Sequence, residues 1–226
     1  MKTYRQLRNS MFLTICVLLG ILLGVAPVTP AASVSVFLNP PQDGRGCGIS
    51  DFGFGQQVAD DFQLAGPFLT ITQVQWWGGY GFNPDPSPGD NFKIRFFYDI
   101  DGSPVVDPFT TMSASSLSRT VTSLTASSWG SHDGGTVYKY LVDLPAPITL
   151  SAGTTYYLSV INNTSSTWGW LEDGSPSHWY RLSDSNSWQY SGRDTNLSFE
   201  LLAVPEPATL LLLSMGGIAL LRKRRA

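Results

Sequence analysis

The chain has few of the residues from which catalytic and metal sites are most often built. Among its 226 residues there are two cysteines and two histidines, and 14% of the residues are charged. Structural zinc sites use cysteine and histidine ligands, so this supply excludes modules that need several cysteines. A phosphate-binding glycine loop and a dinucleotide fingerprint are also missing. The sequence therefore excludes multi-cysteine zinc modules and the proteins defined by a phosphate-binding glycine loop or a dinucleotide fingerprint.

Cysteine is too scarce for a disulfide inside the mature protein. Cys16 lies in an apolar N-terminal run, and Cys47 stands alone in the rest of the chain. One cysteine cannot form an internal disulfide. Two interpretations of Cys47 remain open: a buried, inert thiol in a glycine-rich loop, or a disulfide between two chains.

Basic residues are scarce between Ser33 and Ala203. This segment has 7 lysines and arginines against 16 aspartates and glutamates, a net charge of -9. Such an acidic segment argues against a partner that is nucleic acid or anionic lipid. It is compatible with solubility outside the cell, with divalent cations and with neutral glycans.

Both ends of the chain contain routing signals. Residues 1–32 have a basic start, an apolar stretch over Met11–Val25 and small residues up to Ala32. This pattern predicts a signal peptide that the secretion machinery exports and signal peptidase cleaves near Ala31–Ser33, with an uncleaved anchor as the alternative. The apolar stretch would be about 22 Å long as a helix, short of a hydrocarbon core of about 30 Å.

Residues 204–226 have three parts. Pro205, Glu206 and Pro207 come first, the apolar stretch Ala208–Leu221 follows, and four basic residues at 222–225 end the segment. The prolines predict an extended stretch, and the rest predicts a short transmembrane helix held by a cytoplasmic basic end.

This segment resembles the PEP-CTERM sorting signal. The resemblance implies a Gram-negative bacterium that makes exopolysaccharide, and exosortase, a membrane cysteine transpeptidase, as a partner. It also implies that the sorting machinery reads Pro205, Glu206 and Pro207. We therefore expect a chain that the helix tethers transiently to the inner membrane and that then reaches the cell surface or the extracellular space.

The segment 33–203 alternates apolar and polar residues with the period of a β-strand. Clusters of Gly, Pro, Asn, Asp and Ser separate the alternating runs. The strands expected are 71–77, 92–98, 138–144, 156–160 and 196–202. The pattern predicts an all-β domain, an antiparallel β-sandwich or jelly roll with a single core.

Two local patterns refine this prediction. Leu117, Val121 and Leu124 have helical spacing, but the Ser and Thr residues around them favour a strand or loop. The stretch Leu150–Val160 is typical of a tyrosine corner, in which a Tyr hydroxyl returns to the backbone of the preceding turn. Segments at 57–62, 74–80, 92–98 and 152–158 resemble uncharacterised exported domains that precede PEP-CTERM tails, which implies a β-sandwich and no known activity.

Catalysis has little support in the sequence. Ser131-His132-Asp133 contains the residue types of a triad, but neighbours on a chain point apart and cannot relay hydrogen bonds. Glu172, Glu200 and the aspartates can supply the carboxylate pair of a glycosidase, yet no spacing singles out a pair. We predict a protein that is not an enzyme, with a secreted glycoside hydrolase as the least favoured alternative.

Calcium is the one cofactor that the sequence suggests. Asp99 and Asp101 stand two residues apart before Gly102, and Asp60-Asp61 forms another acidic pair. Calcium prefers six to eight oxygen ligands, which loops of an acidic β-domain can supply. A solvated hairpin turn is the favoured interpretation of Asp99–Gly102, and a calcium site is the alternative.

Tryptophan points to glycans. All seven tryptophans lie between Ser33 and Ala203, and flat aromatic faces stack on sugar rings. Trp76 and Trp77 are adjacent in an expected strand and should face opposite sides, whereas Trp168 and Trp170 should share a face. Packing in the core is the favoured role for any one tryptophan. Trp179 and Trp188, in a polar stretch, are the ones expected to be exposed and to bind glycan.

These observations predict an exported cell-surface or matrix protein. Its expected role is that of a non-enzymatic structural or adhesive component associated with exopolysaccharide. A lectin-like carbohydrate-binding module is the alternative.

Overall fold

A computed structural model describes the domain in detail. The described residues are 32–66, 70–80, 90–129, 132–133, 135–164, 167–174, 178–193 and 195–203. The expected signal peptide, except for Ala32, and the sorting segment with its expected transmembrane helix lie outside the described residues. Within this described part, no helix is long and apolar enough to cross a membrane.

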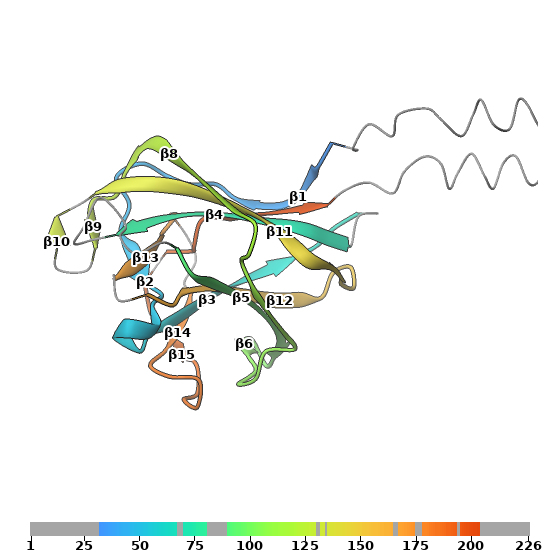
Figure 1. Cartoon of the computed structure of the whole chain (residues 1–226). Coiled ribbons are helices and arrows are strands. Elements are labelled where there is room, and N and C mark those ends of the chain that lie inside the picture. Colours follow the sequence, from blue (N-terminus) through green and yellow to red (C-terminus); the bar gives the residue numbers. More distant parts are fainter. Residues whose placement is uncertain are drawn as a thin grey trace, which may run out of the picture. The chain divides into compact units, whose positions relative to one another are not determined.

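Two antiparallel sheets make up the domain (Figure 1). The first sheet has the order β1 (Val34–Asn39), β16 (Phe199–Ala203), β4 (Thr70–Tyr80), β11 (Thr136–Thr149) and β8 (Leu117–Thr125), with β13 (Trp168–Leu171) between β4 and β2 (Cys47–Ile49). The second has the order β15 (Gln189–Tyr190), β14 (Trp179–Arg181), β3 (Gln57–Gln63), β12 (Thr155–Asn162), β5 (Phe92–Ile100) and β6 (Ser103–Pro104), with β7 (Thr110–Ser113) beside β5. A small hairpin, β9 (Ser128–Trp129) with β10 (His132–Asp133), and a 3-10 turn at Phe52–Phe54 complete the described elements. The all-β antiparallel prediction is confirmed.

The two local patterns are resolved by the structure. Leu117–Thr125 is a strand, because it pairs with β11 and its Ser and Thr residues suit a strand with one exposed face. The hydroxyl of Tyr156 accepts a hydrogen bond from the backbone N–H of Ser151 over 3.1 Å. The tyrosine corner is therefore present, and it secures the turn that leads into β12.

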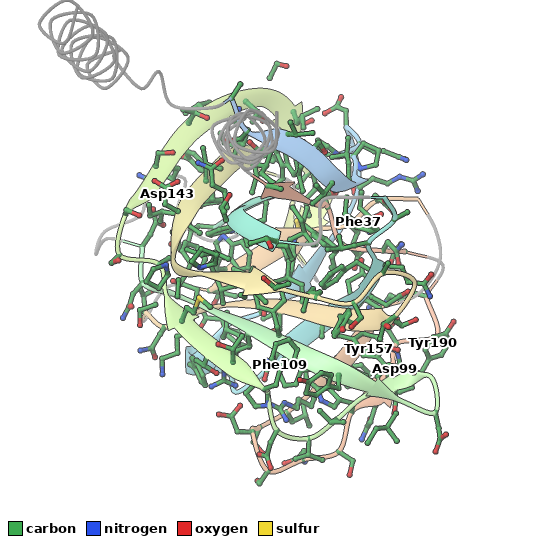
Figure 2. The ribbon with its side chains drawn as sticks, turned by 90° about the vertical axis from the view of Figure 1, so that its right-hand side faces the viewer. Phe37, Asp99, Phe109, Asp143, Tyr157 and Tyr190 are labelled. Atoms are coloured by element: carbon green, nitrogen blue, oxygen red, sulfur yellow. The ribbon has the colours of Figure 1, made fainter. Side chains whose placement is uncertain are left out.

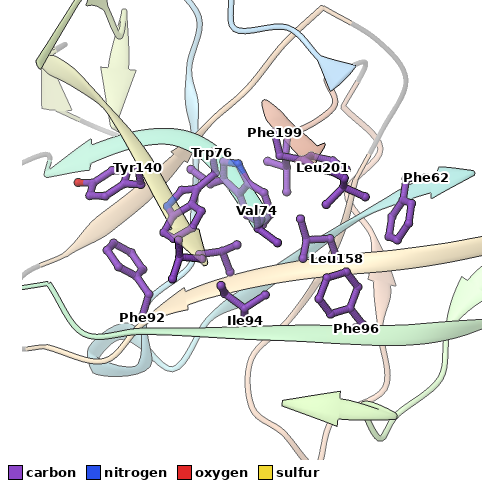
Figure 3. Packing of buried hydrophobic residues seen from close by; sticks show 14 of the residues in the cluster. Phe62, Val74, Trp76, Phe92, Ile94, Phe96, Tyr140, Leu158, Phe199 and Leu201 are labelled. Atoms are coloured by element: carbon purple, nitrogen blue, oxygen red, sulfur yellow. The ribbon is translucent and has the colours of Figure 1, made fainter. Parts of the chain in front are cut away.

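Aromatic rings fill the space between the sheets (Figure 3). Trp76 and Tyr140, on adjacent strands of the first sheet, stack with ring centroids 5.5 Å apart and planes at 9°. Phe92 on the second sheet meets Trp168 edge to face at 4.9 Å. Such pairs stabilise a core by more than their buried area alone. The two sheets are thus held face to face by one continuous aromatic core.

The tryptophan pairs follow the pleat of the strands. Trp76 lies in the main core, whereas Trp77 belongs to a separate cluster on the other face of β4. Trp168 and Trp170 share the main core. Both predictions of relative orientation are confirmed, and all four rings are buried. These rings therefore stabilise the fold.

Gly78 occupies the tightest point of the first sheet. A Cβ atom there would lie 2.4 Å from the carbonyl oxygen of Gly169 on β13 and 2.4 Å from a ring carbon of Trp168. Only glycine lets β13 and the Trp168 ring approach β4 this closely.

Candidate functional site

The outer face of the second sheet displays an aromatic pair. Trp179 on β14 is half-buried, and Tyr190 on β15 is 57% exposed. Their ring centroids lie 5.5 Å apart with planes at 64°. Strand pairing of Trp179 with Tyr190 sets this geometry, so the pair is held by the sheet. Trp179 is where the sequence predicted a glycan-binding side chain, whereas Tyr190 was missed because only the strand pairing brings it there.

Acidic groups lie on the same face of the sheet, around Tyr157 on β12. The Tyr157 hydroxyl donates a hydrogen bond to Asp99 Oδ1 over 3.1 Å, and Tyr157 packs in the same outer cluster as Trp179. Figure 2 shows Tyr157, Asp99 and Tyr190 on one side of the molecule. Burial and the charge of Asp99 raise the pKa of the half-buried Asp61. We call Trp179, Tyr190, Tyr157, Asp61 and Asp99 the aromatic face.

The predicted exposure of Trp188 is wrong. Its side chain is 8% exposed, and its indole N–H donates to the carbonyl of Val105 over 2.9 Å. The Trp188 ring meets Phe97 edge to face at 5.3 Å, and the Arg181 guanidinium lies 4.5 Å from it. The connection between β14 and β15 folds back onto the sheet, which turns a residue in a polar stretch into part of a second core. A ring packed in this way offers no face for a sugar.

Asp99 and Asp101 belong to the hairpin that joins β5 and β6. Asp101 and Gly102 both have positive φ, 53° and 79°, as a two-residue type I′ turn requires. Asp99 Oδ2 accepts a hydrogen bond from the N–H of Gly102, while its other oxygen is bound by Tyr157. The described residues contain no group of three or more His, Cys, Asp or Glu side chains that could hold a metal ion. The strand pairing and the turn show the hairpin that was the favoured interpretation, and the calcium alternative stays a prediction.

A buried pair of arginines fixes the β14–β15 connection. Arg95 on β5 and Arg181 on β14 both donate to Asp184, and both also donate to Gln57 Oε1 over 3.2 and 2.9 Å. The Arg95 hydrogen bond, followed by the charges of Arg95 and Arg181, holds the pKa of Asp184 below its usual range. The one indication of this network in the sequence was that Arg95 falls on the polar side of the alternating strand expected at 92–98.

Replacing Asp184 by alanine is expected to lower the free energy of unfolding by about 2 kcal/mol at pH 7, because two buried guanidinium groups lose their carboxylate. The pKa of Asp184 is lower in the folded than in the unfolded chain. Its contribution is therefore present at neutral pH and is lost as the pH falls below about 4. Urea unfolding of wild type and variant at pH 7 and pH 3 measures this difference. Asp143→Ala, at an exposed carboxylate of the first sheet, is the control, and equal losses in both variants would contradict the assignment.

A cleft of about 300 Å³ lies between β2 and the β14–β15 hairpin. Its lining includes Cys47, Glu172, His178 and Arg193. His178 Nδ1 lies 2.9 Å from the carbonyl oxygen of Thr195, which can only accept, so Nδ1 bears the proton. Burial lowers the pKa of His178, so the ring is neutral near pH 7 and Nε2 bears a lone pair.

Glu172 and Cys47 are the other buried groups of the cleft. Burial raises the pKa of Glu172, and the charges of Arg193 and Arg45 oppose this rise. Glu172 Oε1 lies 3.8 Å from an Arg193 nitrogen and accepts no hydrogen bond from the described residues. Burial, and then the charge of Glu172, raises the pKa of Cys47 well above its usual value. Cys47 is thus a buried, protonated thiol, as one of the two interpretations expected, but it begins strand β2 and does not lie in a loop.

Three residues that the sequence singled out have no described role here. Ser131 lies outside the described residues. His132 and Asp133 form β10, and their side chains, like that of Trp129 on β9, are not described.

Glu200 binds Gln75 across the first sheet, with 2.7 Å from its Oε2 to the amide nitrogen. Glu172 lines the cleft, whereas Glu200 lies on β16 of the first sheet. The two glutamates therefore do not form a carboxylate pair in that cleft.

The described domain is an all-β antiparallel sandwich with an aromatic outer cluster on the second sheet and a small polar cleft. The chain belongs to the family described as a domain of unknown function, DUF7901, which matches residues 36–213. Residues 203–225 match the PEP-CTERM protein-sorting motif. A search of curated proteins found no match. The resemblance to PEP-CTERM proteins is confirmed, and the motif marks an exported protein that exosortase processes and that is sorted to the surface.

Proposed function

We propose that this exported protein is a non-enzymatic structural and adhesive component of the cell surface or matrix that associates with exopolysaccharide. The supporting observation is the aromatic face. Tyr190 and Trp179 present ring surface on paired strands, and the carboxylates of Asp61 on β3 and Asp99 on β5 lie near Tyr157 on the same face of the sheet. Aromatic rings stack on the apolar faces of sugars, and carboxylates accept hydrogen bonds from sugar hydroxyl groups.

The charge and shape of this surface favour a neutral polymer. The domain has a net charge of -9, which repels an anionic polymer but has little effect on a neutral one. Trp179 stands on the three-residue strand β14 and Tyr190 on the two-residue strand β15, which is the edge of the sheet, where a long chain can pass. A polymer laid across this edge can contact both rings without entering a pocket.

A non-enzymatic role requires no catalytic pair of carboxyl groups in the cleft. Glycosidases act with two carboxyl groups about 5–10 Å apart. Among the described residues that line the cleft, Glu172 supplies one carboxyl group. The lectin-like alternative differs from the adhesive role in requiring a specific sugar pocket.

Replacing Trp179 by alanine is expected to weaken retention on the producer's own exopolysaccharide about tenfold, because one stacking surface is lost. Co-sedimentation of the exported protein with that polymer, with calcium and with chelator, measures the effect. Tyr98→Ala is a matched control, since Tyr98 is 51% exposed on β5 but packs against Phe109. Unchanged retention of the Trp179 variant would contradict adhesion through the aromatic face, and loss in chelator would bring Asp99 and Asp101 back as calcium ligands.

A further inference from the structure

The cleft beside β2 contains hydrogen-bond acceptors that the adhesive role does not use. Glu172 and His178 are 5% and 4% exposed, so both lie deep in the lining. Glu172 Oε1 accepts no hydrogen bond from the described residues, and His178 Nε2 bears a lone pair because Nδ1 donates to Thr195. Buried acceptors are stabilised when a partner donates to them. A ligand for this cleft must therefore bring hydrogen-bond donors.

The charges around the cleft select a neutral ligand. Arg193 lies 3.8 Å from Glu172 Oε1, and the charges of Arg193 and Arg45 both act on Glu172. These two cations repel an ammonium group that approaches the carboxylate. An anionic ligand would place its charge beside Glu172 itself. Hydroxyl groups donate to both acceptors without a charge of either sign.

Metal and thiol chemistry do not fit this cleft. Cys47, Glu172 and His178 are metal-ligating residue types, but the described residues contain no group of three or more with the geometry to hold a metal ion. The Cys47 thiol is buried and protonated, whereas nucleophilic cysteines are thiolates. The remaining chemistry of the lining is hydrogen bonding, and the volume of about 300 Å³ is at the small end of ligand pockets.

We propose that the cleft between β2 and the β14–β15 hairpin binds a single neutral sugar residue, whose hydroxyl groups donate to Glu172 Oε1 and His178 Nε2. Arg193, at the rim with its side chain 68% exposed, donates to a ring or hydroxyl oxygen of the same residue. This inference rests on the proposed function and deepens it, because it adds a selective sugar pocket to the adhesive surface. His178 and Trp179 are neighbours on the chain and point to opposite sides, so the cleft and the aromatic face lie on opposite sides of the start of β14.

Because the chain has few histidines, NMR of their rings can test the sugar pocket directly. The chain has two histidines, His132 and His178, so each ring gives an assignable NMR signal in protein labelled at histidine. The full-length chain in a detergent without a sugar head group is titrated with glucose, galactose and mannose. Protonated glucosamine, which is cationic, and glucuronate, which is anionic, are titrated as charged sugars with the same ring size as the neutral hexoses. We expect a saturable shift of the His178 signal with at least one neutral hexose, and weaker binding of both charged rings.

Two variants tie the shift to the cleft. Glu172→Gln is expected to weaken sugar binding about tenfold or more, because a charge-assisted hydrogen bond is lost. Glu200→Gln, which neutralises a carboxylate on the first sheet, should change binding less than twofold. Gly48→Ala is a second variant: its methyl group would lie 3.6 Å from His178 Nε2, an ordinary contact, so the fold tolerates it while access to Nε2 is reduced.

The outcomes separate this inference from the proposed function. Absence of a His178 shift with every neutral hexose, tighter binding of a charged ring, or equal effects of Glu172→Gln and Glu200→Gln would each overturn the sugar pocket. If Trp179→Ala still releases the protein from exopolysaccharide, adhesion stands without the pocket. If the His178 shift is present but Trp179→Ala leaves retention unchanged, the pocket stands and the aromatic face does not mediate adhesion.

Discussion

Replacing Pro205, Glu206 and Pro207 together by alanine is expected to leave the chain unprocessed and retained in the membrane. The sorting motif matched at residues 203–225 includes these three residues near its start. Alanine removes the three side chains that we expect the sorting machinery to read. The expected effect is close to complete, since recognition depends on this one short segment.

The measurement is the distribution of the chain between membrane and released or surface fractions, with its mass determined in each. A control variant changes Ala208 to serine and leaves the three motif residues intact. The same distribution and mass for wild type and the triple variant would contradict exosortase sorting through this motif.

Replacing Gly78 by alanine is expected to lower the free energy of unfolding by about 3 kcal/mol, or the Tm by about 10 °C. The new methyl carbon would lie 2.4 Å from the carbonyl oxygen of Gly169, and backbone cannot move aside as a flexible side chain can. β4 and β13 would have to separate, which would also disturb Trp168 in the main core. Thermal unfolding followed by tryptophan fluorescence measures the change.

Gly192→Ala is the matched control, because Gly192 has φ of 65° and nothing within 4 Å of the added carbon. It should cost about 1 kcal/mol from backbone strain alone. A loss for Gly78→Ala no larger than that of the control would show that the close approach of β13 and β4 does not limit the fold.

Strand periodicity predicted the sheets well because it is a local property. Phe92, Ile94 and Phe96 face the core as their alternation indicated. The tyrosine corner at Tyr156 was also predictable, since its hydrogen bond to Ser151 spans five residues. Both patterns depend on neighbours along the chain, so the sequence contains all the information that they need.

The buried polar groups were not predictable in the same way. Arg95 falls on the polar side of the alternation in 92–98, yet it is 6% exposed and donates to Asp184, 89 residues away. Trp188 was expected to be exposed because its stretch is polar, and it is buried because the β14–β15 connection that contains it folds onto the sheet. The composition of a loop does not reveal the surface onto which it folds.

The sequence by itself determined the destination of this protein and its class of fold. The sorting motif at 203–225 is read as a linear segment, and the strand alternation follows from backbone geometry. Only the tertiary structure decided which side chains meet: Trp179 with Tyr190 on the aromatic face, and Glu172 with His178 in the cleft. These meetings depend on strand order and on how loops fold onto sheets, which are set by contacts between residues far apart in the chain.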